Sequence, residues 1–298
     1  MAERLGVTKT YKLFIGGQFP RTESGRSAPI AGCAGGVIAH TCQASRKDLR
    51  NAVEAAAAAQ PKWSAATAYL RAQVLYRLAE MMEGKRREFE AALDLHGGTG
   101  AGGRRGGEAE VETSIDRVLH FAGWADKYPQ VLGCANPVAG PYHNFTVPEA
   151  VGVVGVVCPD EHPLLSLVSL VAPVVCCGNA CVVLAGERNP IPGCILAEAI
   201  ATSDMPPGVI NILTGFRHEL VPHFASHREI GAIHGAGLSA EHRRSLELGA
   251  AENLKRVTVR ELPIGTSAGG WFDDETCQGP HWIEPFVEFK TIWHPSGA

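Results

Sequence analysis

Residues 151–190, VGVVGVVCPDEHPLLSLVSLVAPVVCCGNACVVLAGERNP, establish the class of fold. Val151–Cys158 is a continuous apolar run, Pro163–Cys177 is a longer apolar segment of helical length, and Ala180–Ala185 is a second short apolar run. Short apolar strands joined by a helix are typical of βαβ units, in which parallel strands are buried on both faces. This stretch therefore predicts a parallel sheet covered by helices.

The same alternation continues along the chain. Helices and strands are expected in turn over Pro190–Thr202, Val209–Leu213, Arg217–Ser226, Ile230–His234, Ser239–Gly249 and Lys255–Val259. The predicted fold class is α/β, an open parallel Rossmann-like sheet with right-handed crossovers. Its domain is expected to span residues 151–262.

Residues 1–128 are expected to form an N-terminal helical arm that packs on this domain. The segment YKLFIGGQFP, residues 11–20, has the pattern of a hairpin with Gly16-Gly17 at its turn. Ser45 and Asp48 have the spacing of a capping box at the start of a helix. The helices of the arm are expected over residues 45–60, 63–89 and 113–127.

A glycine-rich stretch, GGTGAGGRRGG over residues 97–107, lies between two of these helices. A phosphate-binding loop is one interpretation, but no strand precedes the stretch and the G-x-x-x-x-G-K-[ST] spacing is absent. A flexible surface insertion explains the composition better.

Residues 129–150 are rich in Pro, Gly and Asn and are expected to be extended, and residues 284–294 contain an alternating, two-faced strand. No helix connects the second segment to the parallel sheet, so it is expected to pair elsewhere. Together the two segments predict a small β oligomerisation appendage.

Composition excludes some classes of function. Hydrophobic residues make up 45% of the 298, and the formal net charge is −4, so no basic face for nucleic acid is expected. Nine scattered cysteines without a C-x-x-C pair favour a reducing, cytoplasmic setting and no metal site. The apolar run Leu164–Leu184 is interrupted by Pro173, Gly178 and Asn179, which favours a buried helix, turn and strand over a membrane span. The N-terminal residues show no signal peptide.

Several segments in the same order resemble the aldehyde dehydrogenase superfamily. They are YKLFIGGQF (11–19), LVAPVVCCGNACVVLAGERNP (170–190), PPGVINILTG (206–215), NLKRVTVREL (253–262) and FVEFKTIW (286–293). The segment VCPDEHPLLSLVSLVAP (157–173) is most similar to the degenerate second half of the family 16 aldehyde dehydrogenases.

The resemblance implies a nucleotide site that has partly decayed. Pro159 and Glu187 keep positions of the family's NAD(P) site, while Ala185 stands where the family has a ribose-binding lysine. Gly235 and Gly237 keep the turn whose helix N-terminus faces the diphosphate. Weak binding of NAD or NADP is therefore expected, with no cofactor required; a plain tight turn is the competing interpretation of the glycines.

The resemblance also implies that the catalytic groups are lost. A cysteine thiolate, an oxyanion-binding asparagine and a glutamate base are needed, and Glu161 occupies the asparagine's place. Glu261 is the weak candidate base, with Arg260 as the other register, and Cys277 is the weak candidate nucleophile, whose acidic neighbours are expected to raise its pKa. The family's catalytic domain of about two hundred residues, which would follow the base, is expected to be absent.

The function predicted from these observations is that of a non-catalytic scaffold or regulatory subunit. Its strands should pair with a subunit that has a complete aldehyde dehydrogenase catalytic domain, with a larger assembly, or with a second copy of the chain. The alternatives are an NAD(P)-dependent oxidoreductase acting on aldehydes through a relocated nucleophile and an NAD(P)-binding sensor module.

Overall fold

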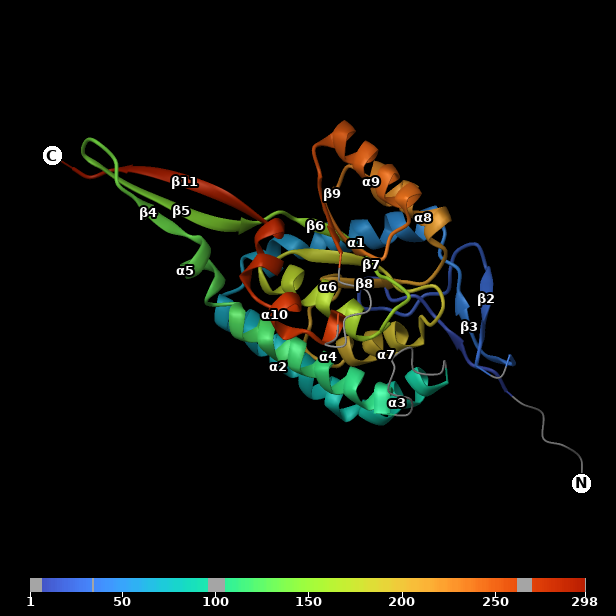
Figure 1. The fold of residues 1–298 in the computed structure, drawn as a ribbon. Helices are drawn as coiled ribbons and strands as arrows, with labels where there is room; N and C mark the ends of the chain where they lie inside the picture. Colours follow the sequence, from blue (N-terminus) through green and yellow to red (C-terminus); the bar gives the residue numbers. More distant parts are fainter. Residues whose placement is uncertain (1–6, 34, 96–104, 262–269, 298) are drawn as a thin grey trace, which may run out of the picture.

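The computed structural model describes residues 7–33, 35–95, 105–261 and 270–297. At its centre lies a five-stranded parallel sheet with the order β10-β9-β6-β7-β8 (Figure 1). Its strands are β6 (Val153–Val157), β7 (Ala180–Leu184), β8 (Ile210–Leu213), β9 (Ile230–Ala236) and β10 (Arg256–Arg260). All five follow the predicted alternation, so the expected α/β class and parallel sheet are confirmed.

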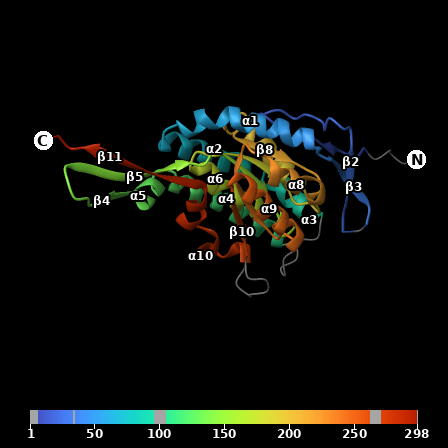
Figure 2. The same cartoon turned by 90° about the horizontal axis from the view of Figure 1, so that it is seen from above.

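Helices cover both faces of this sheet, and Figure 2 shows α1 on one side and α4 on the other. The helices are α1 (Arg46–Ser64), α2 (Ala68–Gly84), α3 (Arg86–Asp94), α4 (Arg105–Trp124), α6 (Leu165–Cys176), α7 (Ile191–Ile200), α8 (Arg217–Ser226) and α9 (Ala240–Asn253). Along β6, Val153 and Val157 belong to the core under α1 and α8, while Val154 and Val156 belong to the core under α6. Burial on both faces explains why this strand is a continuous apolar run rather than an alternating one.

The N-terminal arm contains strands that the sequence pattern did not indicate. β1 (Thr10–Tyr11), β3 (Val37–Cys42) and β2 (Ser27–Ala31) form a separate sheet in that order. The predicted hairpin is reduced to one bridge between Ile15 and Gln18 around the Gly16-Gly17 turn. The preceding Phe14 instead bridges Ile212 of β8, which covers that edge of the central sheet.

Two of the expected helices differ in extent. The capping box of Ser45 and Asp48 is present at the start of α1. The helix expected over 63–89 was wrong as one element, because Thr67 caps a new helix and a further break falls at Lys85. In the glycine-rich stretch, residues 97–104 lie outside the described residues, and residues 105–107 begin α4 rather than continuing a loop.

A third sheet has the order β11-β5-β4 and projects from the body of the molecule (Figure 1). Its antiparallel strands are β4 (Cys134–Asn136), β5 (Tyr142–Ala150) and β11 (Val287–Pro295). Pairing of β11 outside the parallel sheet follows the sequence expectation. The expectation that residues 129–150 are extended throughout was wrong at its start, where Tyr128–Leu132 forms the short helix α5.

Between β10 and β11, the 270–286 segment packs against the body through short helical turns. These are η1 (Gly270–Phe272), α10 (Asp274–Cys277), η2 (Pro280–Trp282) and η3 (Glu284–Phe286). Trp271, Cys277, Trp282 and Phe286 are all buried in the main core. Among the described helices, none is long and apolar enough to cross a membrane.

Candidate functional site

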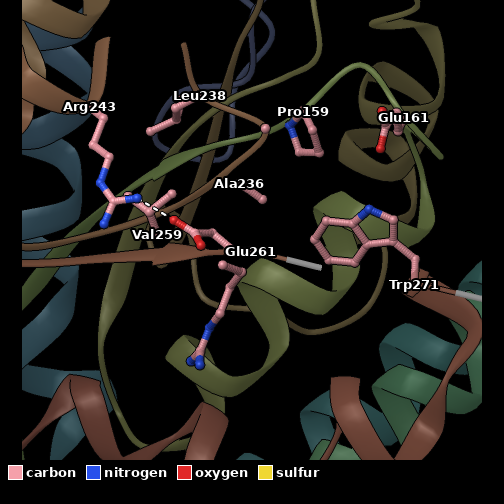
Figure 3. Close-up of a pocket in the computed structure, with 10 residues that line it drawn as sticks. Pro159, Glu161, Ala236, Leu238, Arg243, Val259, Glu261 and Trp271 are labelled. Atoms are coloured by element: carbon pink, nitrogen blue, oxygen red, sulfur yellow. Dashed lines mark hydrogen bonds and ion pairs between the residues drawn. The ribbon is translucent and has the colours of Figure 1, made fainter. Parts of the chain in front are cut away.

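The order of the parallel strands places a crevice between β6 and β9. From β6 the chain builds outward through β7 and β8 on one side, and then through β9 and β10 on the other. Open α/β sheets bind ligands at the carboxyl ends of the strands where this direction reverses. A pocket of about 450 Å³ lies there (Figure 3), lined by Pro159, Glu161, Ala236, Gly237, Leu238, Arg243, Val259, Arg260, Glu261 and Trp271.

Three residues expected at a nucleotide site lie at or beside this pocket. Pro159 and Gly237 line it. Gly237 has φ +60°, and a Cβ added there would lie 2.7 Å from the Cβ of Pro159, so this position requires glycine. Gly235 lies two positions earlier, in strand β9, where a Cβ would approach the Leu238 side chain at 3.1 Å. The two glycines therefore allow the ends of β6 and β9 to approach closely.

Glu187, the fourth expected residue, is not among the residues that line the pocket; it belongs to a polar cluster at the ends of β6 and β7. Its carboxylate accepts a hydrogen bond of 2.5 Å from the backbone N–H of Arg217 at the start of α8. The Arg217 guanidinium donates to the Cys158 carbonyl at 2.9 and 3.2 Å and to Asp160 Oδ2 at 2.9 Å. Burial raises the pKa of the Asp160 carboxyl, but hydrogen bonds from Arg217 and from the Arg188 N–H outweigh it and the net pKa is lowered. The buried Arg217 side chain thus lies beside the ends of β6 and β7 and is not among the residues that line the pocket.

Both arginines that line the pocket have partners. Arg243 forms ion pairs with Glu261 and, at 2.9 Å, with Glu247. Arg260 donates from Nε to His234 Nε2 at 3.0 Å, and its guanidinium carbon lies 4.2 Å from the centre of the Trp282 ring. Burial lowers the pKa of Arg260 to about 10, which leaves it charged at neutral pH. Arg243 is therefore paired with carboxylates, whereas the described partners of Arg260 are all uncharged.

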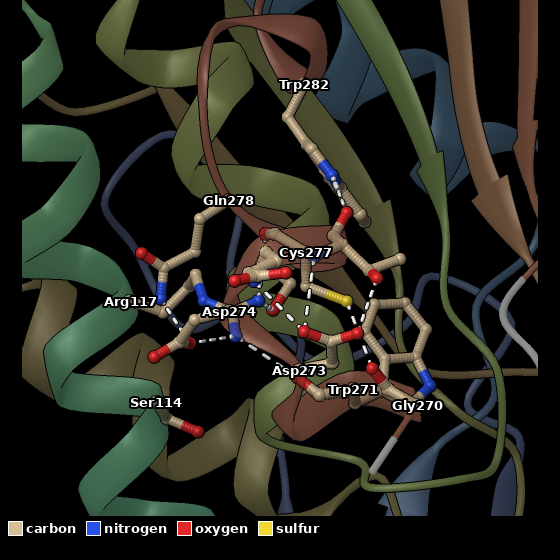
Figure 4. Close-up of polar contacts among 12 residues, drawn as sticks. Ser114, Arg117, Gly270, Trp271, Asp273, Asp274, Cys277, Gln278 and Trp282 are labelled. Carbon is tan, nitrogen blue, oxygen red and sulfur yellow. Dashed lines mark hydrogen bonds and ion pairs between the residues drawn. The ribbon is translucent and has the colours of Figure 1, made fainter. Parts of the chain in front are cut away.

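Cys277, the candidate nucleophile, lies in the 270–286 segment and is not among the residues that line the pocket. Its thiol is buried and donates to the Gly270 carbonyl at 3.3 Å (Figure 4). The pKa of this thiol is raised, as expected, but the main cause is burial rather than the neighbouring carboxylates of Asp273 and Asp274, which contribute less. The nearby Arg117 acts in the opposite direction.

The residue that fixes this segment was missed by the sequence analysis. Arg117 of α4 is fully buried and donates to the carbonyls of Cys277 and Trp271, at 3.0 and 3.1 Å, and to Asp274 Oδ1 at 3.1 Å (Figure 4). It also donates to Ser169 Oγ at 2.9 Å. An arginine on a helix carries no local signal that it will contact carbonyls more than 150 positions away.

The sheet order, its helical layers and the crevice at the point of reversal define an α/β protein with a Rossmann-like nucleotide-binding type of fold. Residues 21–262 match the model of the aldehyde dehydrogenase family. The chain belongs to the aldehyde dehydrogenase family.

Known relatives match most of this chain. Retinal dehydrogenase 2 of Mus musculus is 32% identical over 255 residues, covering 84% of this chain and 48% of the relative. Benzaldehyde dehydrogenase, mitochondrial, of Antirrhinum majus is 31% identical, covering 83% and 46%. The NAD+ complex of the aldehyde dehydrogenase from Bacillus cereus superposes with a TM-score of 0.78 at 27% identity, covering 84% of this chain and 50% of that one. The chain spans about half the length of the relatives it matches.

Proposed function

We propose that this chain is a non-catalytic member of its family, a scaffold or regulatory subunit that assembles through the β4-β5-β11 sheet. The observation that carries the proposal is the placement of its thiols. All nine cysteines are described, and none lines the pocket at the ends of β6 and β9. Aldehyde oxidation in the manner of the family needs a thiolate beside the bound substrate and cofactor, and Cys277 is buried with a raised pKa.

The oxyanion-binding amide and the general base of the family mechanism are also not matched by suitable groups in this chain. Glu161, in the place of the oxyanion-binding amide, lines the pocket with a side chain that offers no donor when ionised. The loss of one such donor costs about 3 kcal/mol of transition-state stabilisation in other enzymes. Glu261 is held in an ion pair with Arg243, which opposes its use as a base.

The spacing between the candidate base and β11 supports the same proposal. In active members of the family that the sequence resembles, a catalytic domain follows the base. In this chain the 262–286 interval connects the candidate base Glu261 to β11. We propose that the chain is most similar to the degenerate half of the family 16 aldehyde dehydrogenases. It would keep the nucleotide-binding type of domain at 151–262 and the strands at 129–150 and 284–294, but not the catalytic domain.

The residues at the crevice fit a dinucleotide poorly. Structures of relatives hold NAD, among them PnpE, which is 26% identical with a TM-score of 0.80 over 86% of this chain and 52% of that one. In this chain, Arg217 is bonded to Asp160 and to the Cys158 carbonyl beside the ends of β6 and β7, and both pocket arginines contact other groups. A diphosphate would have to compete with these contacts, so we propose weak NAD or NADP binding and no required cofactor.

The projecting sheet supports assembly with a protein partner. β11 is one of its two edge strands, and the side chains of Phe289 and Trp293 are 47% and 58% exposed. Trp293 contacts Tyr142, also exposed, with ring centroids 5.8 Å apart. A long exposed edge with an aromatic face tends to add a further strand. The proposed partner is a subunit with a complete aldehyde dehydrogenase catalytic domain, a larger assembly, or a second copy.

Catalysis is tested by incubating the purified protein with NAD or NADP and a panel of aliphatic and aromatic aldehydes. We expect no increase in absorbance at the reduced-nicotinamide band above a blank without protein. Cys277→Ala is the matched variant: an increase that this substitution abolishes would show a working enzyme and refute the proposal.

Assembly is tested by capture of partners with the native chain and with Trp293→Ser. Sedimentation velocity of the purified chain separates pairing between copies from pairing with another subunit. We expect the substitution to weaken the complex at least about tenfold, because buried aromatic residues dominate interface energies. Equal recovery of the partner with both proteins would place the interface elsewhere.

The sensor alternative is favoured by one observation, the pocket at the point where the strand order reverses. Calorimetric titration with NAD distinguishes it from the bare scaffold. Micromolar affinity would support the sensor, whereas the contacts of the pocket arginines lead us to expect binding weaker than about 1 mM, equivalent to roughly −4 kcal/mol.

A further inference from the structure

The open edge of β11 carries a row of backbone groups that its own sheet leaves unpaired. Just before the strand, the Phe286 carbonyl accepts from the Val151 N–H at 3.4 Å. Just after it, the Ser296 N–H donates to the Pro141 carbonyl at 2.9 Å, and the pairing with β5 between these points has no register shift. Because the residues that face a neighbouring strand alternate, the even-numbered residues of β11 direct their backbone groups to β5. The odd-numbered residues direct theirs to the open edge, where no described strand lies.

The two ends of this row complement each other. The Val287 carbonyl already accepts from Arg256 Nη1 at 2.5 Å, so it is satisfied without a further donor. Pro295, the last residue of the row, has no N–H to donate. An incoming strand with a proline opposite Val287 therefore loses no hydrogen bond. β11 of a second copy, running antiparallel, offers this match at both ends, because each Pro295 then lies opposite the other copy's Val287.

The outward-facing residues between these ends agree with the same register. Thr291 lies at its centre and faces Thr291 of the second copy, so the N–H and C=O groups of this pair bond each other across a two-fold axis. Phe289 faces Trp293 of the second copy, and both side chains are exposed in the single chain. Aromatic pairs on facing strands contribute to strand pairing.

The even-numbered side chains restrict the alternatives. In this register Glu288 faces His294 of the second copy, whose ring can donate a hydrogen bond to a carboxylate. Lys290 faces Ile292, so no like charges lie opposite each other. A register centred on Lys290 would set two ammonium groups opposite each other, which is unfavourable. A register centred on Ile292 would leave the first residues of each strand without a partner.

The shape of the molecule leaves room for this contact. Figure 1 shows β4, β5 and β11 projecting from the body, with the C-terminus at the far tip. Since the two β11 strands run antiparallel, each body lies beyond the tip of the other copy's sheet. We infer that two copies of the chain form a dimer in which their β11 strands pair antiparallel about Thr291 and join the two sheets. The dimer is one form of the proposed assembly through the β4-β5-β11 sheet, and it rests on that proposal.

Sedimentation velocity of the purified chain over a range of concentrations measures the dimer, and we expect a monomer–dimer equilibrium. Thr291→Pro removes the central N–H of both copies. Because this N–H faces the open edge, the substitution keeps the hydrogen bonds between β11 and β5. The dissociation constant should rise at least about tenfold, since both central carbonyls lose their donors.

Thr291→Val is the matched control for this substitution. It also loses the side-chain hydrogen bond between Thr291 and Thr146, at 2.9 Å, but it keeps the backbone N–H. Its dissociation constant should change by less than about threefold. Urea denaturation checks that both variants fold, and cysteine variants test the pairing independently if Thr291→Pro folds poorly.

Disulfide cross-linking measures the register in a chain whose exposed Cys33 and Cys134 are replaced by serine. Directly opposite residues of a non-hydrogen-bonded pair have Cα atoms about 4.5 Å apart, which a disulfide can span. In the inferred register Lys290 and Ile292 form such a pair between copies. The double variant Lys290→Cys with Ile292→Cys should therefore give a dimer band on a non-reducing gel, and neither single variant should. A band from either single variant would show a different register and overturn the inference.

A purified chain that stays monomeric at every concentration would refute the dimer, as would equal dissociation constants for Thr291→Pro and Thr291→Val. A monomer that still captures another subunit would leave the proposed assembly in place with a different partner. The proposed absence of aldehyde oxidation is measured separately by absorbance, so its failure is distinguishable from failure of the dimer.

Discussion

The 270–286 segment has little regular secondary structure but is the more deeply buried of two neighbouring stretches; the β11 strand that follows it is regular but largely exposed. The segment is built of turns and short helices, yet Trp282, Ile283 and Phe286 in it are almost completely buried. β11 is a regular nine-residue strand, yet most of its side chains are exposed. Regular hydrogen bonding thus does not mark the part of the chain that stabilises the fold.

The reason lies in what each stretch contacts. The segment packs on the parallel-sheet domain, where Arg117 and Arg260 bind its carbonyls. β11 contacts chiefly β5, and a two-stranded contact without a covering layer buries little apolar area. We therefore infer that the first stretch stabilises the fold and that the second is available for a partner.

The largest expected effect comes from paired substitutions at Phe286 and Phe289, three residues apart. Phe286 is 0% exposed and Phe289 is 47% exposed. Phe286→Ala should lower the free energy of unfolding by about 3–5 kcal/mol, because it leaves a cavity in the core. Phe289→Ala should change it by less than about 1 kcal/mol. Urea denaturation of both variants measures this, and similar losses would show that the two stretches are equally part of the core.

A smaller loss is expected at the residue that anchors the segment. Arg117→Met keeps the hydrocarbon of the side chain but leaves the carbonyls of Trp271 and Cys277 without their donors. Unpaired buried polar groups cost about 1–3 kcal/mol each, so we expect a loss of roughly 2–4 kcal/mol. Arg50→Met, at an exposed position of α1, is the control and should change stability by less than about 0.5 kcal/mol. Chemical denaturation gives both values; an unchanged Arg117→Met would remove the basis for the anchor.

The smallest effect is expected from the cap of α10 within the segment. A hydrogen bond from Thr276 Oγ1 at 2.5 Å is the main reason that the pKa of the Asp273 carboxyl lies below its ordinary value. A lowered carboxyl pKa stabilises the fold above the unfolded-state pKa of about 3.9, and this contribution is lost as pH falls through the folded pKa. Asp273→Asn should therefore reduce the loss of stability below about pH 4. Acid titration followed by tryptophan fluorescence measures this, and identical acid profiles would argue against the cap.

The parallel sheet was predictable because its signals are local. Each strand is a short apolar run and each helix lies between two such runs, as in Val153–Val157 and Leu165–Cys176. The sheet of the N-terminal arm was not found. Its strand Ser27–Ala31 contains Ser and Pro and has mostly exposed or half-exposed side chains, so it lacks the apolar pattern from which a strand is inferred.

The candidate site was predictable only along the strand ends. Pro159 and Gly237 were placed from sequence because they lie within two residues of the ends of β6 and β9. Trp271 and Arg243 were not, since they reach the pocket from the 270–286 segment and from α9. The actual position of Glu187, capping α8 beside Arg217, likewise depends on elements that meet only in three dimensions.

The sequence by itself determined the βαβ alternation, the two-faced β11 strand and the residues that depart from the family's catalytic pattern, because each is encoded in neighbouring positions. Tertiary structure alone decided which charges are neutralised. Arg243 reaches Glu261 across 18 positions, and Arg217 reaches Asp160 across 57, whereas Glu161 finds no partner among the described residues. Electrostatic pairing depends on distance in space, and spacing along the chain does not report it.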